Sequence, residues 1–180
     1  MTAPEDFGPR QRHDPTKSLV GFEVGDVQYA VPISRVREIV NPMRLVELPH
    51  APPAVIGVCD YRGDVVPVVD LRSRFGLSQV PSTRKTKWIV ADAQGRSLAL
   101  VVDAVTGVFG TGGADLRPTP ELGSGDDARG FAGVLRFGEE LVFVLEMSRL
   151  RELAEPLAQG QSSADPNSRT RAWDPSERAG

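Results

Sequence analysis

Residues 55–76 read VIGVCDYRGDVVPVVDLRSRFG, and this stretch decides the fold. Two apolar runs with the composition of strands flank one tight turn at 62–64, and after Asp70 the apolar spacing becomes helical. The pattern predicts a β-hairpin followed by a short helix that Asp70 caps and Gly76 ends. Because Pro67 has no N–H group to donate to a ladder, we expect it at an edge or bulge of the sheet.

The same pattern returns in weaker form near the C-terminus, where Gly133 aligns with Gly57. The chain therefore reads as a duplicated strand-turn-strand-helix unit. Since no reactive cluster accompanies the repeat, it favours paired small β-barrels that serve as a docking scaffold over an enzyme cleft. The further equivalent pairs are Val58 and Val134, Val65 and Leu141, Val66 and Val142, Val68 and Val144, Val69 and Leu145, Asp70 and Glu146, and Leu71 and Met147.

Apolar patterns outside these two units predict further short elements. Alternation around glycine-containing turns indicates hairpins, and a spacing of three or four indicates short helices. Many short strands with a few short helices make an all-β fold the expectation. In chain order the elements are a hairpin over 20–31, a short helix over 33–40, a strand over 45–48, a hairpin over 88–102, a helical turn over 103–109, and a hairpin with a closing helix over 131–153.

Length and composition place the chain among globular proteins. It has 180 residues, of which 40% are hydrophobic and 25% charged, enough for one compact domain with tails. We expect a flexible N-terminal tail over 1–17, an ordered domain over 18–154 and a disordered C-terminal tail over 155–180. In the second tail, Trp173 is either an incidental aromatic or an exposed anchor. Each half alone would bury too little surface for generous stability, so the halves should share a core.

The charge balance and the single cysteine argue against several classes of protein. The formal net charge is −3, with basic residues scattered among acidic ones, which argues against a nucleic-acid partner. Cys59 cannot form a disulfide within the chain, and no run approaches the roughly 18 apolar residues needed to span a bilayer. We therefore expect a cytoplasmic protein without direct membrane insertion.

Candidate catalytic and metal-binding residues are few. Cys59 could act as a nucleophile with His50 as its base, but it lies in an apolar strand, where a buried and inert thiol is expected. One cysteine and two histidines do not supply the four ligands that structural zinc usually takes. The glycine-rich segment 110–113 lacks the lysine of a phosphate-binding loop. No cofactor or metal is expected, and an enzyme that depends on Cys59 stays open as the less favoured alternative.

Longer blocks of sequence carry a specific resemblance. They read LVGFEVGDVQYAVPISRVREIV, ELPHAPPAVIGVCDYRGDVVPVVDLRSRFG, LALVVDAVTGV, LRPTPEL and LVFVLEMSRL. Together they resemble the CheW family of chemotaxis coupling proteins over nearly all of 18–153. The resemblance implies two interlocked SH3-like five-stranded β-barrels, in agreement with the repeat.

The resemblance also implies a function without chemistry of its own. Members of this family are adaptors that link the cytoplasmic tips of chemoreceptors to the histidine kinase CheA, whose regulatory domain has the same fold. The family further implies recruitment to receptor arrays at the membrane and assembly into arrays or rings. A scaffold of a related motility or regulatory pathway, which binds kinase without receptor, is the alternative.

Contact residues are implied by positions that match the family's motifs. At Arg62 the contact interpretation is favoured, because an exposed, semi-rigid arginine beside apolar residues is a common interface hot spot. Asp60-Tyr61 stands where the family usually has Asn-Leu, so the choice of partner could differ here. The implied protein-binding residues are Val36, Glu38, Ile39, Arg62 and Gly63 in the first half, and Arg117, Glu121 and Leu122 in the second.

Overall fold

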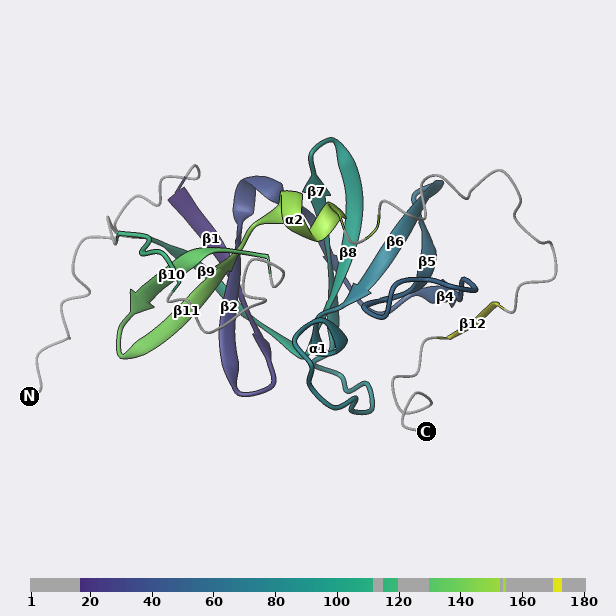
Figure 1. The fold of residues 1–180 in the computed structure, drawn as a ribbon, viewed down its shortest axis with the longest axis horizontal. Coiled ribbons are helices and arrows are strands. Elements are labelled where there is room, and N and C mark those ends of the chain that lie inside the picture. Colours follow the sequence, from purple (N-terminus) through teal and green to yellow (C-terminus); the bar gives the residue numbers. More distant parts are fainter. Residues whose placement is uncertain (1–16, 112–114, 120–129, 153, 155–169, 173–180) are drawn as a thin grey trace, which may run out of the picture.

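Two β-sheets of short strands make up the computed structural model of the chain (Figure 1). The residues described are 17–111, 115–119, 130–152, 154 and 170–172. The five-stranded sheet has the strand order β10-β11-β2-β1-β9. Its strands are β1 (Ser18–Val24), β2 (Val27–Pro32), β9 (Ala104–Gly110), β10 (Phe131–Phe137) and β11 (Glu140–Leu145).

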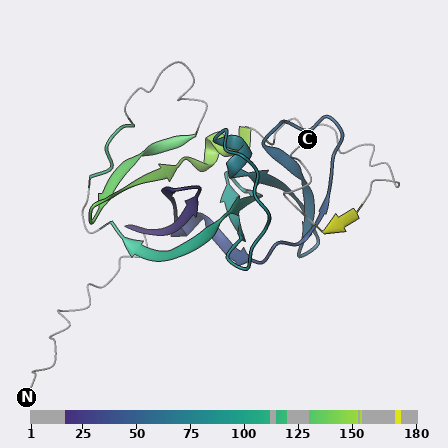
Figure 2. The ribbon, with the colours of Figure 1, turned by 90° about the horizontal axis from the view of Figure 1, so that it is seen from below.

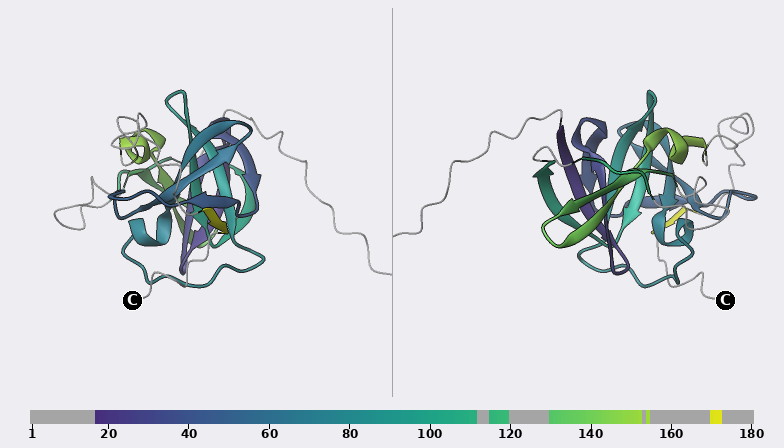
Figure 3. Two further views of the ribbon diagram at one scale, coloured as in Figure 1. Left: turned by 90° about the vertical axis from the view of Figure 1, so that its right-hand side faces the viewer. Right: turned by 60° about the vertical axis from the view of Figure 1, so that its left-hand side comes forward.

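The second sheet is seven-stranded, with the order β12-β4-β5-β6-β8-β7-β3. Seen from below, the green hairpin of β10 and β11 and the blue hairpin of β5 and β6 lie on opposite sides of the molecule (Figure 2). The two turned views show that neither sheet is flat (Figure 3). The expectation of an all-β fold is confirmed. The strands are β3 (Val36–Val40), β4 (Arg44–Val46), β5 (Val55–Tyr61), β6 (Asp64–Asp70), β7 (Lys87–Ala93), β8 (Arg96–Val102) and β12 (Thr170–Ala172), and the helical segments are a 3₁₀ turn at Ile33–Arg35, α1 (Leu71–Arg74) and α2 (Met147–Glu152).

Each of the two curved sheets forms one barrel, and each barrel contains strands from both halves of the sequence. β6, from the first half, pairs in parallel with β8, and Val68 lies opposite Ala99. In the other sheet β11 pairs in parallel with β2, and Val144 lies opposite Ala30. Val68 and Val144 are equivalent in the repeat. In both sheets, therefore, the second strand of a repeat hairpin pairs with a strand from the other half of the chain. The two barrels are therefore interlocked.

The repeat is visible in single hydrogen bonds. Asp70 N donates to Ala54 O at 2.8 Å, and the equivalent Glu146 N donates to Gly130 O at 2.7 Å. Each of these carboxylates also accepts a hydrogen bond from the backbone N–H group two residues later, at the start of the following helix. The predicted cap at Asp70 is thus confirmed, and Glu146 does the same at α2.

A shared core joins the barrels. The largest buried cluster takes Phe22 from β1, Val69 from β6 and Leu150 from α2. A second cluster around Trp88 fills the seven-stranded barrel, and a third around Val144 fills the other. Because the largest cluster draws on both sheets, neither half holds a complete core of its own, as the size of each half predicts.

Two segments predicted to be helical are strands. Residues 33–40 form the 3₁₀ turn and then β3, whose exposure alternates and which pairs with β7. Residues 104–110 form β9, which pairs with β1. Both segments contain several β-branched residues and lie against the open edge of a strand, so pairing prevails over the apolar spacing.

Two smaller differences concern the seven-stranded sheet. Pro67, expected at an edge or a bulge, lies in a strand that β5 and β8 flank, so β6 as a whole is not an edge strand. Its ladder to β8 begins at Val68, one residue after the proline, so the missing N–H group breaks no bond of that ladder. The strand predicted over 45–48 lies slightly earlier, as β4.

β12 lies inside the segment predicted to be a C-terminal tail. It pairs antiparallel with β4, with Arg171 opposite Leu45. Nearly all of the rest of both predicted tails lies outside the described residues. Within the described part of the chain, neither α1 nor α2 nor any other helix has the length and apolar character needed to cross a membrane.

Candidate protein-binding surfaces

Three polar side chains, Glu38, Tyr61 and Arg62, meet where β3 approaches the end of β5, and we call them the Glu38 cluster. Tyr61 Oη donates to Glu38 Oε2 at 2.6 Å, and Arg62 Nη2 donates to the same oxygen at 2.7 Å. The guanidinium carbon lies 5.3 Å from the centroid of the Tyr61 ring. Because β6, β8 and β7 separate β5 from β3 along the sheet, the cluster links its two sides and helps to close the barrel.

The protonation states of the cluster follow from these contacts. The hydrogen bond from Tyr61, together with the charge of Arg62, lowers the pKa of Glu38 below its usual value. The same hydrogen bond raises the pKa of Tyr61, because a phenol that donates to a carboxylate holds its proton more firmly. At neutral pH the cluster is therefore a carboxylate, a neutral phenol and a guanidinium.

The backbone of the turn presents Arg62 to solvent. Arg62 and Gly63 have φ angles of 54° and 87°, so both central residues of this hairpin turn are left-handed. Asp60 Oδ1 accepts a hydrogen bond from Gly63 N at 2.8 Å, which fixes the turn. The Arg62 side chain is 72% exposed although it is bound to Glu38, so its guanidinium keeps donors for a partner.

The predicted contact residues on β3 divide into two kinds. Val36 is half-buried and packs against the shared core, so much of its side chain serves packing. Ile39 is 39% exposed and lies on the opposite face of the strand from Glu38. Ile39 is therefore accessible to a partner, beside but not within the Glu38 cluster.

Of the predicted contact residues of the second half, only Arg117 is described, and it lies apart from the Glu38 cluster, against the five-stranded sheet. Arg117 is exposed, and its backbone makes a two-bond bridge with Val134 of β10 in the five-stranded sheet. This bridge is the counterpart, in the repeat, of the pairing between Val46 and Val58. Glu121 and Leu122 lie outside the described residues.

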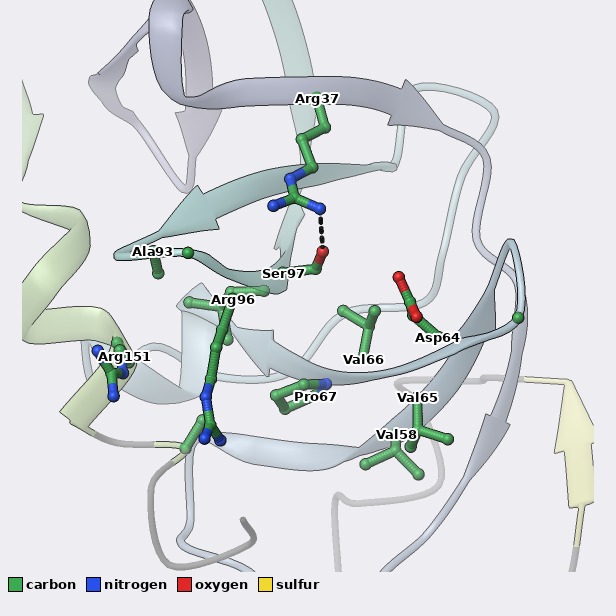
Figure 4. Close-up of a pocket in the computed structure, with 14 residues that line it drawn as sticks. Arg37, Val58, Asp64, Val65, Val66, Pro67, Ala93, Arg96, Ser97 and Arg151 are labelled. Atoms are coloured by element: carbon green, nitrogen blue, oxygen red, sulfur yellow. Dashed lines mark hydrogen bonds between the residues drawn. The ribbon is translucent and has the colours of Figure 1, made fainter.

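A groove of about 450 Å³ opens where β6 and β8 diverge (Figure 4). The two strands pair only from Val68 onward, so the first half of β6 faces open space on that side. Val65 is 58% exposed at this groove. Its basic lining residues are Arg37, Arg96 and Arg151, and Arg37 is held by Ser97 and Asp92. We call this the β6–β8 groove.

A second groove, of about 510 Å³, opens where β2 and β11 diverge, and we call it the β2–β11 groove. Leu141, the repeat equivalent of Val65, is also 58% exposed. The charged residues that line this groove are acidic: Glu23, Asp26 and Glu140. Sequence reasoning missed both grooves, although the alignment of Val65 with Leu141, two apolar residues directly after a turn, was a signal.

Cys59 is buried in the core of the seven-stranded barrel. Burial, with a smaller contribution from the charge of Asp60, raises its pKa to about 11. At neutral pH almost all of the thiol is protonated and therefore a poor nucleophile. The expectation that Cys59 is buried is confirmed. Among the residues that the structure describes, no three His, Cys, Asp or Glu side chains gather in a way that could hold a metal ion.

Comparisons with known proteins agree with this architecture. The family model of the CheW-like domain matches residues 18–155. Chemotaxis protein CheW of Rhizobium meliloti (strain 1021) is 37% identical over 132 residues, which cover 73% of this chain and 84% of that protein. A probable chemotaxis protein CheW of Rhizobium etli is 33% identical over 135 residues, covering 74% and 86%.

A solved structure is similar as well. The crystal structure of scaffolding protein TtCheW from Thermoanaerobacter tengcongensis matches with a TM-score of 0.67 and 25% sequence identity. The match covers 77% of this chain and 89% of that chain. The two interlocked barrels are thus shared with a scaffolding protein.

Proposed function

Because the chain belongs to the CheW-like family of chemotaxis scaffold proteins, we propose that it is a non-enzymatic adaptor that couples chemoreceptor tips to the histidine kinase CheA. In this proposal the protein works in the cytoplasm and is recruited to receptor arrays at the membrane. It binds both partners and transforms no substrate.

The observation that carries the proposal is the pair of exposed apolar side chains, Val65 and Leu141. Each lies on a strand of a rigid barrel at the mouth of a groove. Exposed apolar side chains beside a groove with a polar rim are typical of protein interfaces. Their equivalence in the repeat supports two comparable docking ends, which is what an adaptor needs to hold two neighbours at once.

Different partners are assigned to different surfaces. We assign the regulatory domain of CheA to the grooves and to Arg117 on the five-stranded side of the molecule, and, from the resemblance alone, to Glu121 and Leu122. We assign the receptor tip to Arg62, to Gly63 at the rim of the β6–β8 groove, and to the exposed Ile39, where a guanidinium with free donors adjoins an apolar side chain. Receptor and kinase can then bind together, and rings or arrays can form.

Reconstitution with purified CheA and a receptor-tip fragment tests these assignments. Val65→Glu and Leu141→Glu each place a charge at an apolar contact and should weaken CheA binding at least about tenfold. Arg62→Glu should weaken receptor binding and leave CheA binding intact. Val108→Glu is the matched control, since Val108 is 53% exposed on β9 and lines neither groove.

The outcomes separate the alternatives. A wild-type chain that binds neither CheA nor receptor would refute the proposal. Binding to CheA alone would favour a scaffold of a related pathway that works without a receptor. Cys59→Ala should couple the kinase as well as wild type, and a turnover that disappears with Cys59 would instead favour the enzyme alternative.

A further inference from the structure

Tyr61 packs in the core of the seven-stranded barrel and also makes a hydrogen bond at its surface. Its ring is buried in the same cluster as Val66 and Trp88. A phenylalanine ring could occupy that site equally well, but the Tyr61 hydroxyl reaches the rim of the barrel and donates to Glu38 at 2.6 Å. One side chain is thus anchored in the core and holds a charged group at the surface.

The group that Tyr61 holds in turn orients Arg62. Arg62 Nη2 donates to the same oxygen of Glu38, and the guanidinium lies near the face of the Tyr61 ring. A free arginine side chain samples many rotamers, and binding must fix one of them. Two restraints that originate at a buried anchor remove part of this freedom before a partner arrives.

The charges around the turn indicate which acceptor Arg62 fits. Glu38, Asp60 and Asp64 place three carboxylates on or beside the turn, and Arg37 is already paired with a carboxylate on β7. A carboxylate on the partner would be repelled by these groups. A neutral acceptor meets less repulsion, and the unpaired carbonyls at the C-terminal end of a helix are such acceptors.

We propose that Tyr61 is a positioning residue for partner binding, holding Glu38 and Arg62 so that Arg62 donates to backbone carbonyls at a helix end of the partner. This inference rests on the proposed function, because the helix end belongs to the hairpin tip of a chemoreceptor. A leucine at position 61 would have no hydroxyl with which to hold Glu38. The tyrosine therefore gives this chain its own means of fixing Arg62.

The positioning role can be measured on the isolated protein. NMR order parameters of the Arg62 Nε–H group are compared in wild type, Tyr61→Phe and Tyr29→Phe. Tyr29→Phe is the matched control, since it removes the chain's other tyrosine hydroxyl from the other barrel. We expect Arg62 to lose order only in Tyr61→Phe. Equal order in all three proteins would overturn the positioning role, whatever the partner does.

The binding role is measured with a receptor-tip fragment that forms a helical hairpin. Tyr61→Phe should weaken its affinity about three- to tenfold, with thermal unfolding no more affected than in Tyr29→Phe. Arg62→Lys should weaken it similarly, because the charge is kept but the planar fork of donors is lost. Equal affinity of Tyr61→Phe and wild type would refute the role in binding.

The salt dependence of the same dissociation constants tests the acceptor. A neutral carbonyl predicts an affinity that changes little between low and moderate salt, whereas a steep decrease would indicate a carboxylate and refute this part of the proposal. If wild type itself does not bind the fragment, the proposed function fails at the receptor. The order of Arg62 in the isolated protein then still decides whether Tyr61 positions it.

Discussion

Replacing Gly57 with alanine should disrupt the contact between β4 and β5. Gly57 has a φ angle of 150°, a conformation that side chains rarely adopt. An added Cβ would lie 2.3 Å from the carbonyl oxygen of Val46, which belongs to the backbone of β4 and cannot rotate away as a side chain could. The substitution therefore combines backbone strain with a collision that must push β4 away.

The size of the effect follows from these two contributions. The strained backbone costs about 1–3 kcal/mol. Moving β4 also opens the site of Leu45, which is buried against β5, and partial exposure of a leucine costs up to about 2 kcal/mol more. The expected loss of about 2–5 kcal/mol is a large part of the 5–15 kcal/mol that stabilises a typical domain.

Two other glycines separate the contributions. Gly95 has a φ angle of 82° and no atom within 4 Å of an added Cβ, so Gly95→Ala measures strain alone, about 1 kcal/mol. Gly133, the repeat equivalent of Gly57, lies outside the left-handed region, but its added Cβ would be 2.6 Å from the carbonyl oxygen of Arg117. Gly133→Ala therefore measures the collision alone.

Urea unfolding of the three variants gives their free energies of unfolding, and hydrogen exchange at β4 reports where the damage lies. The loss should be largest for Gly57→Ala, smaller for Gly133→Ala and smallest for Gly95→Ala. Exchange of the β4 amides should accelerate in Gly57→Ala only. A Gly57→Ala protein that loses no more stability than Gly95→Ala would refute the reasoning from close approach.

Lowering the pH should reveal how much Glu38 contributes to the stability of the folded protein. Because the pKa of Glu38 is lowered in the folded state, this contribution is present above the ordinary pKa of 4.5 and is lost as the pH falls through the folded value. Urea unfolding from neutral pH to about pH 3 should therefore show a smaller acid-induced loss in Glu38→Gln than in wild type, and equal losses would contradict the assignment. Cys59 should react with a disulfide reagent at least about a hundredfold more slowly in the native protein than in urea, because burial keeps the thiol protonated and covered. Similar reaction rates in the two states would disprove the burial of this thiol. Truncation after Ala154 removes β12 and should accelerate amide exchange in β4 but not in β1, and unchanged exchange in β4 would argue against their pairing.

Hairpins could be predicted from the sequence because their signals are local. In 55–76 the alternation, the turn residues and the cap at Asp70 all lie within one short stretch, and the structure follows them. β3 and β9 could not be predicted in this way. Their strand state depends on β7 and β1, which are distant in sequence, and the apolar spacing of a half-buried edge strand resembles that of a short helix.

The candidate site shows the same division between local and long-range information. The resemblance singled out Glu38 and Arg62, and the structure places them in contact. Nothing local to residue 61 indicates that its hydroxyl reaches β3, because barrel closure brings the two strands together. The grooves also arise from long-range structure, since they open where two parallel strands diverge.

The two grooves share a backbone origin but differ in charge. Val65 and Leu141 occupy equivalent positions, and each groove lies beside the first residues of a parallel ladder. Around Val65 the lining carries three arginines with Asp64, whereas around Leu141 it carries three carboxylates. A partner surface that complements one groove is therefore repelled by the other. If the two grooves dock partners as proposed, their equivalent position in the repeat gives two similar docking ends, and their different charges would let each end bind a different neighbour.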